Sequence, residues 1–196
     1  MERNYAPLPL TQLAVDAPFC HPAKPPKVTL NSPALDVMTD FRQTHAVTIH
    51  PEATIDEANQ KMIEQGVRLL LVIITSDKVT GVVTASDILG EKPVQLLQGR
   101  GIKRKEIAVA ELMTPQDQLD VIMFDSLLGA KVGHVVTTLK RAGRQHALIA
   151  ELERQSHQQI VRGLFSASQI ARQLGVPVHT TEVARTFSEI EATLRH

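Results

Sequence analysis

The chain of 196 residues carries 21 Lys and Arg against 21 Asp and Glu, and this zero net charge gives no overall field that would draw it to nucleic acid or to an anionic membrane surface. It has no Trp and one Tyr, so the aromatic platforms on which single-stranded nucleic acids stack are nearly absent, and we expect no nucleic-acid partner. A single cysteine excludes an internal disulfide, and the first residues lack a signal-peptide pattern, so we expect a cytoplasmic protein.

Residues 1–33 are predicted to form a proline-rich arm. Seven of the eleven prolines fall there, and proline lacks a backbone donor and blocks helices. The arm holds too many apolar residues for a solvated tail, so we expect it to lie along the body of the protein or along a second copy. These residues are Leu8, Leu10, Leu13, Val15 and Phe19. Cys20 and His21 are adjacent here, where a nucleophile and its base rarely find hydrogen-bonding geometry, so an enzyme acting through Cys20 is a remote alternative.

Residues 34–98 are predicted to form a first repeat. It begins with "ALDVMTD" and a short strand at residues 46–50, and a helix follows at residues 54–66. The helix is indicated by Thr54 and Glu57 in capping-box positions and by Gly66 at its end. Two apolar strands, "LLLVIIT" and "VTGVV", should be covered on both faces. This apolar stretch is far shorter than the roughly 20 residues that span a bilayer, so we expect no membrane partner.

Residues 107–175 run through the same order of elements as a second repeat. "AELMT" corresponds to "LDVMT", and a helix ends at Gly143 as the earlier one ends at Gly66. Two paired strands and a closing helix follow. A unit of this size buries too little surface to fold alone. We therefore expect an α/β protein, of the α+β type, in which two pseudo-symmetric β-α-β-β-α repeats pack through their sheets.

The remaining segments are a basic linker at residues 99–106 and a predicted helical extension at residues 176–196. The linker could neutralise phosphate groups, although runs of this kind are more often solvated. Its basic residues are Arg100, Lys103, Arg104 and Lys105. The eight histidines show no metal-ligand spacing, so we expect no metal site.

The end of the last strand in each repeat carries the most informative pattern. "GVVTASDILG" at residues 81–90 returns as "GLFSASQIAR" at residues 163–172, and we call these the first and second junctions. Thr84 and Asp87 have the spacing of a helix cap, and Ser166 with Gln169 satisfies the same logic. A carboxylate at this place can also accept both hydroxyls of a ribose while backbone N–H groups hold a phosphate. Both interpretations remain open from the residues alone.

The order of elements, the "VMT" and "LMT" segments before the strands, and "GVVTASDIL" together resemble the cystathionine-β-synthase (CBS) domain, which occurs in tandem pairs called Bateman modules. The resemblance covers about residues 34–175. It implies a module that is not an enzyme, needs no cofactor, and binds an adenine nucleotide (AMP, ADP or ATP) or a related adenosyl ligand between the repeats. It also implies a homodimer, for which an exposed apolar helix face is expected to supply contacts. This face is formed by Val132, Val135, Val136 and Leu139.

The resemblance also implies the binding residues. A first site would use Thr84, Ser86 and Asp87 of the first junction. Around the base it would add residues of "THAV" and of the following strand, which are Thr44, Ala46, Val47, Arg68 and Leu70. A weaker second site would use Ser166, Ser168 and Gln169, because Gln169 stands where the family has a ribose-binding aspartate. Leu71 and Leu148 stand where many members have proline in the strand that lines the adenine pocket.

We therefore expect a non-catalytic regulatory protein that signals to an unknown effector protein through linkage between ligand binding and the arrangement of the repeats. The alternative is a structural dimerisation or scaffold protein without a ligand. In that case the junctions would be helix caps only, and side chains would fill the clefts.

Overall fold

The computed structural model describes residues 6–20, 27–75, 78–101 and 103–176, without the side chain of Arg100. Its body holds two four-stranded sheets. The first sheet has the order β2 (Thr48–Ile49), β3 (Leu69–Ile73), β4 (Val79–Thr84) and β5 (Thr114–Pro115). The second has the order β1 (Thr39–Asp40), β8 (Gln159–Ser166), β7 (His146–Leu152) and β6 (Val121–Met123). The helices are α1 (Ile55–Gln65), α2 (Ala85–Leu89), α3 (Glu91–Arg100), α4 (Val109–Leu112), α5 (Val132–Ala142) and α6 (Ala167–Gln173).

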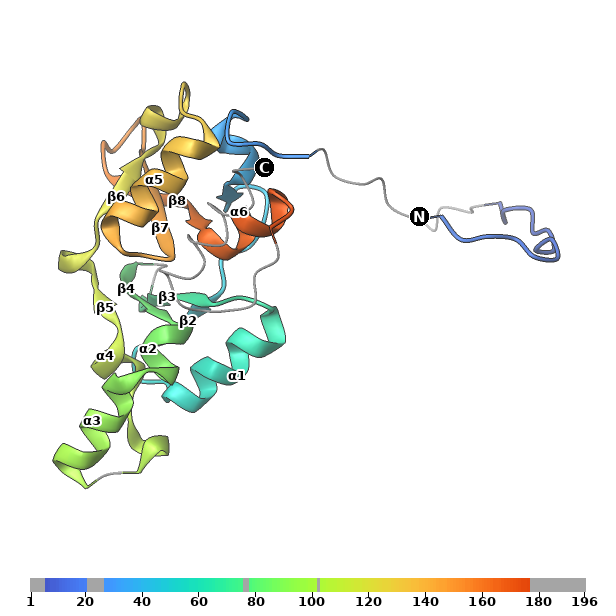
Figure 1. The fold of residues 1–196 in the computed structure, drawn as a ribbon. Coiled ribbons are helices and arrows are strands. Elements are labelled where there is room, and N and C mark those ends of the chain that lie inside the picture. Colours follow the sequence, from blue (N-terminus) through green and yellow to red (C-terminus); the bar gives the residue numbers. More distant parts are fainter. Residues whose placement is uncertain (1–5, 21–26, 76–77, 102, 177–196) are drawn as a thin grey trace.

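The two sheets face each other; α1 and α2 cover the outer face of the first sheet, and α5 and α6 cover that of the second (Figure 1). Leu69, Leu71 and Val82 of the first sheet pack with Leu148 of the second. One core lies between α1, α2 and the first sheet, and another lies between α5, α6 and the second sheet. The predicted fold class, with two repeats packed through their sheets, is confirmed.

Local sequence signals determine where the long helices begin and end. At the start of α1, Thr54 N–H donates to Glu57 Oε2 at 2.7 Å, and Glu57 N–H donates to Thr54 Oγ1 at 3.2 Å. Gly66 then ends the helix in the left-handed region, with φ of 63°. Gly143 ends α5 in the same conformation, with φ of 61°. The capping box and both glycine stops are confirmed.

Each repeat completes its core with a segment from the other repeat. Residues 34–40, the first lead-in, place β1 beside β8, with Thr39 opposite Leu164. Residues 107–115, the second lead-in, place β5 beside β4, with Val82 opposite Thr114. The buried side chains follow the same exchange. Ala34 and Val37 lie in the core of the second repeat, and Ile107, Val109 and Leu112 lie in the core of the first. The repeats are therefore interlocked rather than joined end to end.

Gly81 of β4 allows the close approach of the second lead-in. A Cβ atom at this position would lie 2.6 Å from the carbonyl oxygen of Thr114 and 3.0 Å from Met113 Sδ. Gly163 of β8 meets the carbonyl oxygen of Thr39 in the same way. In both repeats the glycine leaves room for the backbone of the exchanged strand.

We expect Gly81→Ala to lower the free energy of unfolding by roughly 1–3 kcal/mol, because the new methyl group must displace a backbone carbonyl. Urea denaturation of the wild type and the variant measures this change. Gly99→Ala is the matched control, since nothing lies within 4 Å of the added Cβ in the exposed helix α3, and it should raise stability by about 0.5–1 kcal/mol. Equal stability of wild type and Gly81→Ala would contradict the close approach.

We expected the apolar face of α5 to supply a dimer surface, but this face is buried within its own chain. Val132, Val135 and Leu139 are buried in the core of their own chain, and Val136 packs against that core. The first lead-in covers this face with Ala34 and Val37. The interpretation of these residues as exposed dimer contacts is therefore wrong, and the homodimer stays a prediction without them.

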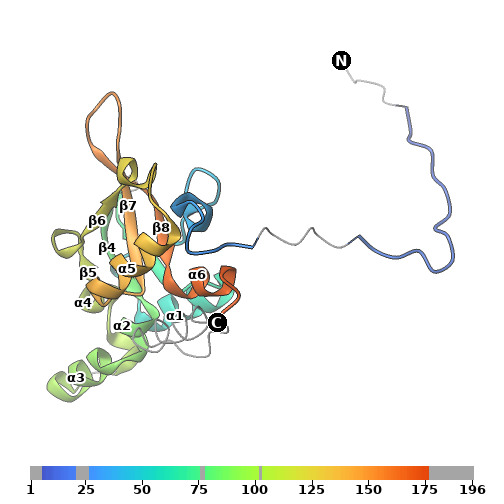
Figure 2. The ribbon, with the colours of Figure 1, turned by 45° about the horizontal axis from the view of Figure 1, so that its top comes forward.

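Residues 6–20 of the arm project away from the body in both views (Figures 1 and 2). Residues 27–33, the other described part of the arm, lie along the second repeat, where the carbonyl oxygens of Leu30 and Ser32 accept the N–H groups of Gly133 and Val132, both at 2.9 Å. The large apolar side chains of residues 6–20 are between 76% and 97% exposed. The expectation that the arm lies along its own body is confirmed for residues 27–33, where Val28 and Leu30 pack against the core of the second repeat. It does not hold for residues 6–20, whose contact with a second copy stays a prediction. Cys20 is exposed, whereas its neighbour His21 lies outside the described residues. The predicted C-terminal extension lies outside them too, from residue 177 onward.

Candidate functional site

Two clefts lie between the repeats and share a wall formed by Leu69, Gln145 and His146. The large cleft has a volume of about 690 Å³ and the small cleft about 280 Å³. The pseudo-symmetry of the repeats relates the two, because Leu69 and His146 each begin the central strand region of their sheet, opposite Thr84 and Ser166 respectively. Each cleft therefore combines the junction of one repeat with the start of the central strand, β3 or β7, of the other repeat.

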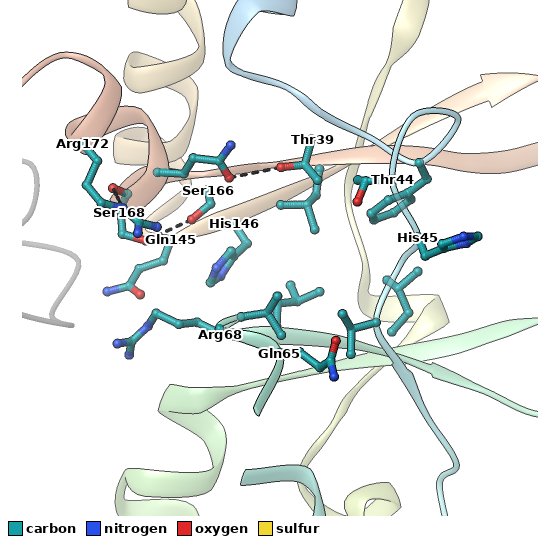
Figure 3. A pocket seen from close by; sticks show the side chains of 18 residues that line it. Thr39, Thr44, His45, Gln65, Arg68, Gln145, His146, Ser166, Ser168 and Arg172 are labelled. Atoms are coloured by element: carbon teal, nitrogen blue, oxygen red, sulfur yellow. Dashed lines mark hydrogen bonds between the residues drawn. The ribbon is translucent and has the colours of Figure 1, made fainter. Parts of the chain in front are cut away.

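The large cleft lies between the first lead-in with its following loop, the start of β3, and the second junction (Figure 3). Thr39, Phe41, Thr44, His45 and Val47 come from the first of these segments. The end of α1 and the start of β3 supply Gln65, Gly66, Val67, Arg68, Leu69 and Leu71. Leu164, Ser166, Ser168, Gln169 and Arg172 come from the third. Charged and amide groups of Arg68, Gln145 and Arg172 gather at one end, and Thr44 and His45 lie at the other.

The structure does not bring together the residues predicted for the first site. Thr84, Ser86 and Asp87 line the small cleft, whereas Thr44, Val47 and Arg68 line the large one. The reason is the face-to-face packing of the sheets, which turns each junction toward the other repeat. Two further predicted residues line neither cleft. Leu70 is fully buried in the core of the first repeat, and Ala46 packs between the sheets.

The residues of the weaker predicted site line the larger of the two clefts. Ser166, Ser168 and Gln169 line the large cleft together with Thr44, Val47 and Arg68. Leu71 lines the large cleft and Leu148 the small one, so the two positions that depart from the family's proline do face the clefts. The basic linker residues Lys103, Arg104 and Lys105 line neither, and Arg104 is paired with Asp56 at 2.9 Å.

The first junction is a helix cap in this structure. Asp87 Oδ2 accepts hydrogen bonds from the Thr84 N–H at 3.0 Å and from the Thr84 hydroxyl at 2.6 Å. The ammonium group of Lys92 donates to Asp87 Oδ1 at 2.6 Å. A carboxylate has about four acceptor positions, so these three bonds leave it short of the two that a ribose diol needs. Asp87 therefore cannot clamp a ribose without losing one of its present partners.

The second junction has no such cap. Ser166 precedes α6 without a hydrogen bond from its side chain to the helix backbone, and its hydroxyl lies 3.1 Å from that of Ser168. Gln169 Oε1 accepts a hydrogen bond from the Thr39 hydroxyl at 3.1 Å, which links the second junction to the first lead-in. The two serine hydroxyls line the large cleft and can bond a ligand there.

The charged groups of the two clefts differ in sign. Arg68, Arg172, His45 and His146 line the large cleft, and none of its lining residues is Asp or Glu. Burial, assisted by the positive charge of Arg68 and opposed by the carboxylate of Asp87, lowers the pKa of His146 to about 4. His146 is therefore neutral near pH 7, and the two arginines supply fixed positive charge. The small cleft instead contains two carboxylates, those of Asp87 and Asp120, and one arginine, Arg144.

The sequence analysis missed Thr39, Gln145, His146 and Arg172 as cleft residues. Three of them had a signal in the sequence. Gln145 and His146 stand at the start of β7 as Arg68 and Leu69 stand at the start of β3, so aligning the two repeats would have found them. Arg172 had a weaker one, because it follows Gln169 by three residues and so shares a helix face with it.

The described part of the structure gives no support for a metal site or for a membrane-spanning helix. Among residues 6–20, 27–75, 78–101 and 103–176, no three His, Cys, Asp or Glu side chains group in a way that could hold a metal ion. No helix in the described part of the chain has the length and apolar character needed to cross a membrane.

Comparison with known proteins relates the first repeat to a protein family. The family model of the CBS domain matches residues 34–93. No protein of curated function has a sequence that matches this chain.

Solved structures with the same fold are distant in sequence. A protein from Pyrococcus horikoshii is 22% identical, with a TM-score of 0.54, over 79% of this chain and 100% of its own. CBSX2, a CBS-pair protein from Arabidopsis thaliana solved in complex with AMP, is 21% identical, with a TM-score of 0.50, over 72% of this chain and 94% of its own. The CBS domain of a bacterial CNNM/CorC family Mg²⁺ transporter, in complex with ATP, is 18% identical, with a TM-score of 0.50, over 74% and 89%.

Proposed function

We propose that this chain is a regulatory module that binds an adenine nucleotide or a related adenosyl ligand in its large cleft, because residues 34–93 match the family model of the CBS domain and the body has the fold of a CBS domain pair. The main support for this proposal is the size of the large cleft. Its volume of about 690 Å³ falls within the range of small-molecule sites, whereas the small cleft at about 280 Å³ falls just below it. AMP and ATP in the complexes of CBSX2 and the transporter domain support the class of ligand.

The lining of the large cleft suits a nucleotide. Val47, Leu71 and Leu164 offer apolar surface for a base. Arg68 and the hydroxyl of Ser168 offer donors for phosphate or ribose oxygens. A base has two apolar faces and polar edges, so it needs both kinds of surface in one cleft.

The mechanism we propose is linkage between the two repeats. A ligand in the large cleft contacts the first repeat through Arg68 and the second through Ser168 and Arg172. Such a ligand stabilises one relative arrangement of the repeats over others. An effector protein that prefers this arrangement then binds more tightly when the ligand is present, by the same coupling free energy.

We expect AMP, ADP or ATP to raise the thermal stability of the purified protein, because a ligand at 100 times its Kd adds about 2.7 kcal/mol. Differential scanning fluorimetry with each nucleotide measures the shift. Ser168→Ala should weaken binding several-fold, since it removes a hydroxyl from the large cleft. Ser86→Ala, at the equivalent position in the small cleft, is the matched control and should leave the affinity unchanged. No stabilisation by any adenosine compound would favour the scaffold alternative.

A further inference from the structure

The large cleft contains two arginines whose guanidinium groups form no ion pair with any residue that the structure describes. Arg42, Arg104, Arg144 and Arg162 each pair with an Asp or Glu side chain. Outside the cleft, the exposed Arg141 and Arg154 have no ion pair among the described residues either, so the feature that sets the cleft apart is that Arg68 is unpaired and half-buried. Arg172 is exposed, and its Nε donates to the Ser168 carbonyl oxygen at 3.4 Å, which leaves its other donors for a ligand. Arg68 is half-buried, so its charge is partly removed from water without a compensating carboxylate. This arrangement favours an anion as the missing partner.

The two arginines come from opposite walls of the cleft. Arg68 precedes β3 of the first repeat, and Arg172 lies on α6 of the second. Figure 3 shows both at the same end of the cleft, with Gln145 between them. A phosphate group at this end can meet a guanidinium from each repeat, and guanidinium groups bind phosphate with paired hydrogen bonds.

Gln169 removes the negative charge that the equivalent position carries in the other cleft. Asp87 supplies a carboxylate to the small cleft, whereas Gln169 supplies a neutral carboxamide to the large one. Gln169 Oε1 already accepts a hydrogen bond from the Thr39 hydroxyl at 3.1 Å, and the amide nitrogen of Gln169 can only donate hydrogen bonds. A positively charged ligand therefore meets two fixed cations and no counter-charge in the large cleft.

We propose that the large cleft selects nucleotides by charge: a phosphate group binds between Arg68 and Arg172, and Gln169 is the specificity-determining residue that excludes cationic adenosyl ligands. The inference rests on the proposed function and names the ligand class of the same site. It requires affinity to increase with the number of phosphates on the nucleotide. It also requires S-adenosylmethionine, whose sulfonium is positive, to bind more weakly than adenosine.

Competition against a fluorescent adenine nucleotide tests this proposal with ATP, AMP, adenosine and S-adenosylmethionine as probes. The wild type should bind them in that order. Arg68→Gln and Arg172→Gln should each weaken ATP binding about 10- to 100-fold, the loss of a charge-assisted hydrogen bond or two, and leave adenosine unchanged. Arg144→Gln is the matched control, because this arginine lines the small cleft and pairs with Asp120 at 3.1 Å. It should change none of the four affinities.

Gln169→Glu isolates the role of charge, since it keeps the shape of the side chain and leaves an oxygen for the Thr39 hydroxyl. It should weaken ATP and strengthen S-adenosylmethionine, so that their ratio shifts at least tenfold. Circular dichroism checks that each variant is folded. If Gln169→Glu does not fold, the proposal is tested by the two arginine variants. Equal binding of all four probes by the wild type, or an unchanged ratio in folded Gln169→Glu, would overturn the inference alone. Binding of none of the probes by the wild type would overturn the proposed function as well.

Discussion

Replacing Ile107 with alanine is expected to lower the free energy of unfolding by about 2–5 kcal/mol and to loosen the first repeat, although Ile107 stands at the start of the second repeat in sequence. Its side chain is fully buried in the core with α1, β3 and β4. Its carbonyl oxygen also accepts the Ile55 N–H at 3.0 Å, which holds the second lead-in against α1. Urea denaturation gives the total loss of stability.

Hydrogen exchange shows where that loss falls. Amides of α1, β3 and β4 should lose protection before those of α5, β7 and β8. Ile63→Ala is the matched control. Ile63 is also an isoleucine, but it is 67% exposed on α1, so its truncation should lower the free energy of unfolding by about 0.5 kcal/mol or less. Protection lost first in α5, β7 and β8 would mean that the lead-ins are not exchanged.

Replacing Arg162 with methionine is expected to cost roughly 3 kcal/mol or more at pH 7, because it leaves two carboxylates without their main partner. Arg162 donates from Nε and Nη2 to the two oxygens of Asp40, both at 2.7 Å, and from Nη1 to Glu151 Oε2 at 2.8 Å. Its side chain is only 11% exposed, and its guanidinium lies 4.8 Å from the centre of the Phe124 ring. Arg42→Met is the matched control, since Arg42 is 59% exposed and its bond to Glu151 is worth about 1 kcal/mol or less.

The same ion pair predicts a pH dependence. The Arg162 guanidinium lowers the pKa of Asp40 to about 2 from its ordinary value of 3.8. The stability that this carboxylate contributes is therefore fully present above about pH 4 and is lost as pH falls toward 2. Chemical denaturation of wild type and Arg162→Met at pH 7, 4 and 3 should show the difference between them shrinking at the lowest pH. A constant difference across this range would contradict the role of Asp40.

The parts of the fold that depend on neighbouring residues could be predicted from the sequence. Thr54, Glu57 and Gly66 determine the ends of α1 through hydrogen bonds and backbone conformation within a few residues. The pairing of β3 with β4 follows from two apolar runs joined by a short turn. The twofold repeat itself was visible because Gly81 and Gly163 stand at matching places in the two junctions. These signals act over short distances, so one sequence is enough to find them.

The exchange of the lead-ins could not be predicted in this way. "VMT" and "LMT" are nearly identical, and either could pair with β4 or with β8. The choice depends on the packing of two sheets, which no local pattern encodes. The error in the site has the same origin, because Thr84 and Thr44 were grouped by their place in one repeat. The structure separates them into different clefts by turning each junction toward the other repeat.

The exchanged lead-ins also impose an order of events on a chain that leaves the ribosome N-terminus first. When residue 98 emerges, every strand of the first sheet except β5 has been made, yet Ile107, Val109 and Leu112 are still missing from its core. Meanwhile Ala34 and Val37 have no core to enter until α5, β7 and β8 have been made. Domains that fold one after another during synthesis gain protection early. Here the first core can close only after residue 115 has been made, and the first lead-in stays without its core until the second repeat has been made as well. The nascent chain therefore carries unfinished apolar surface through most of its synthesis.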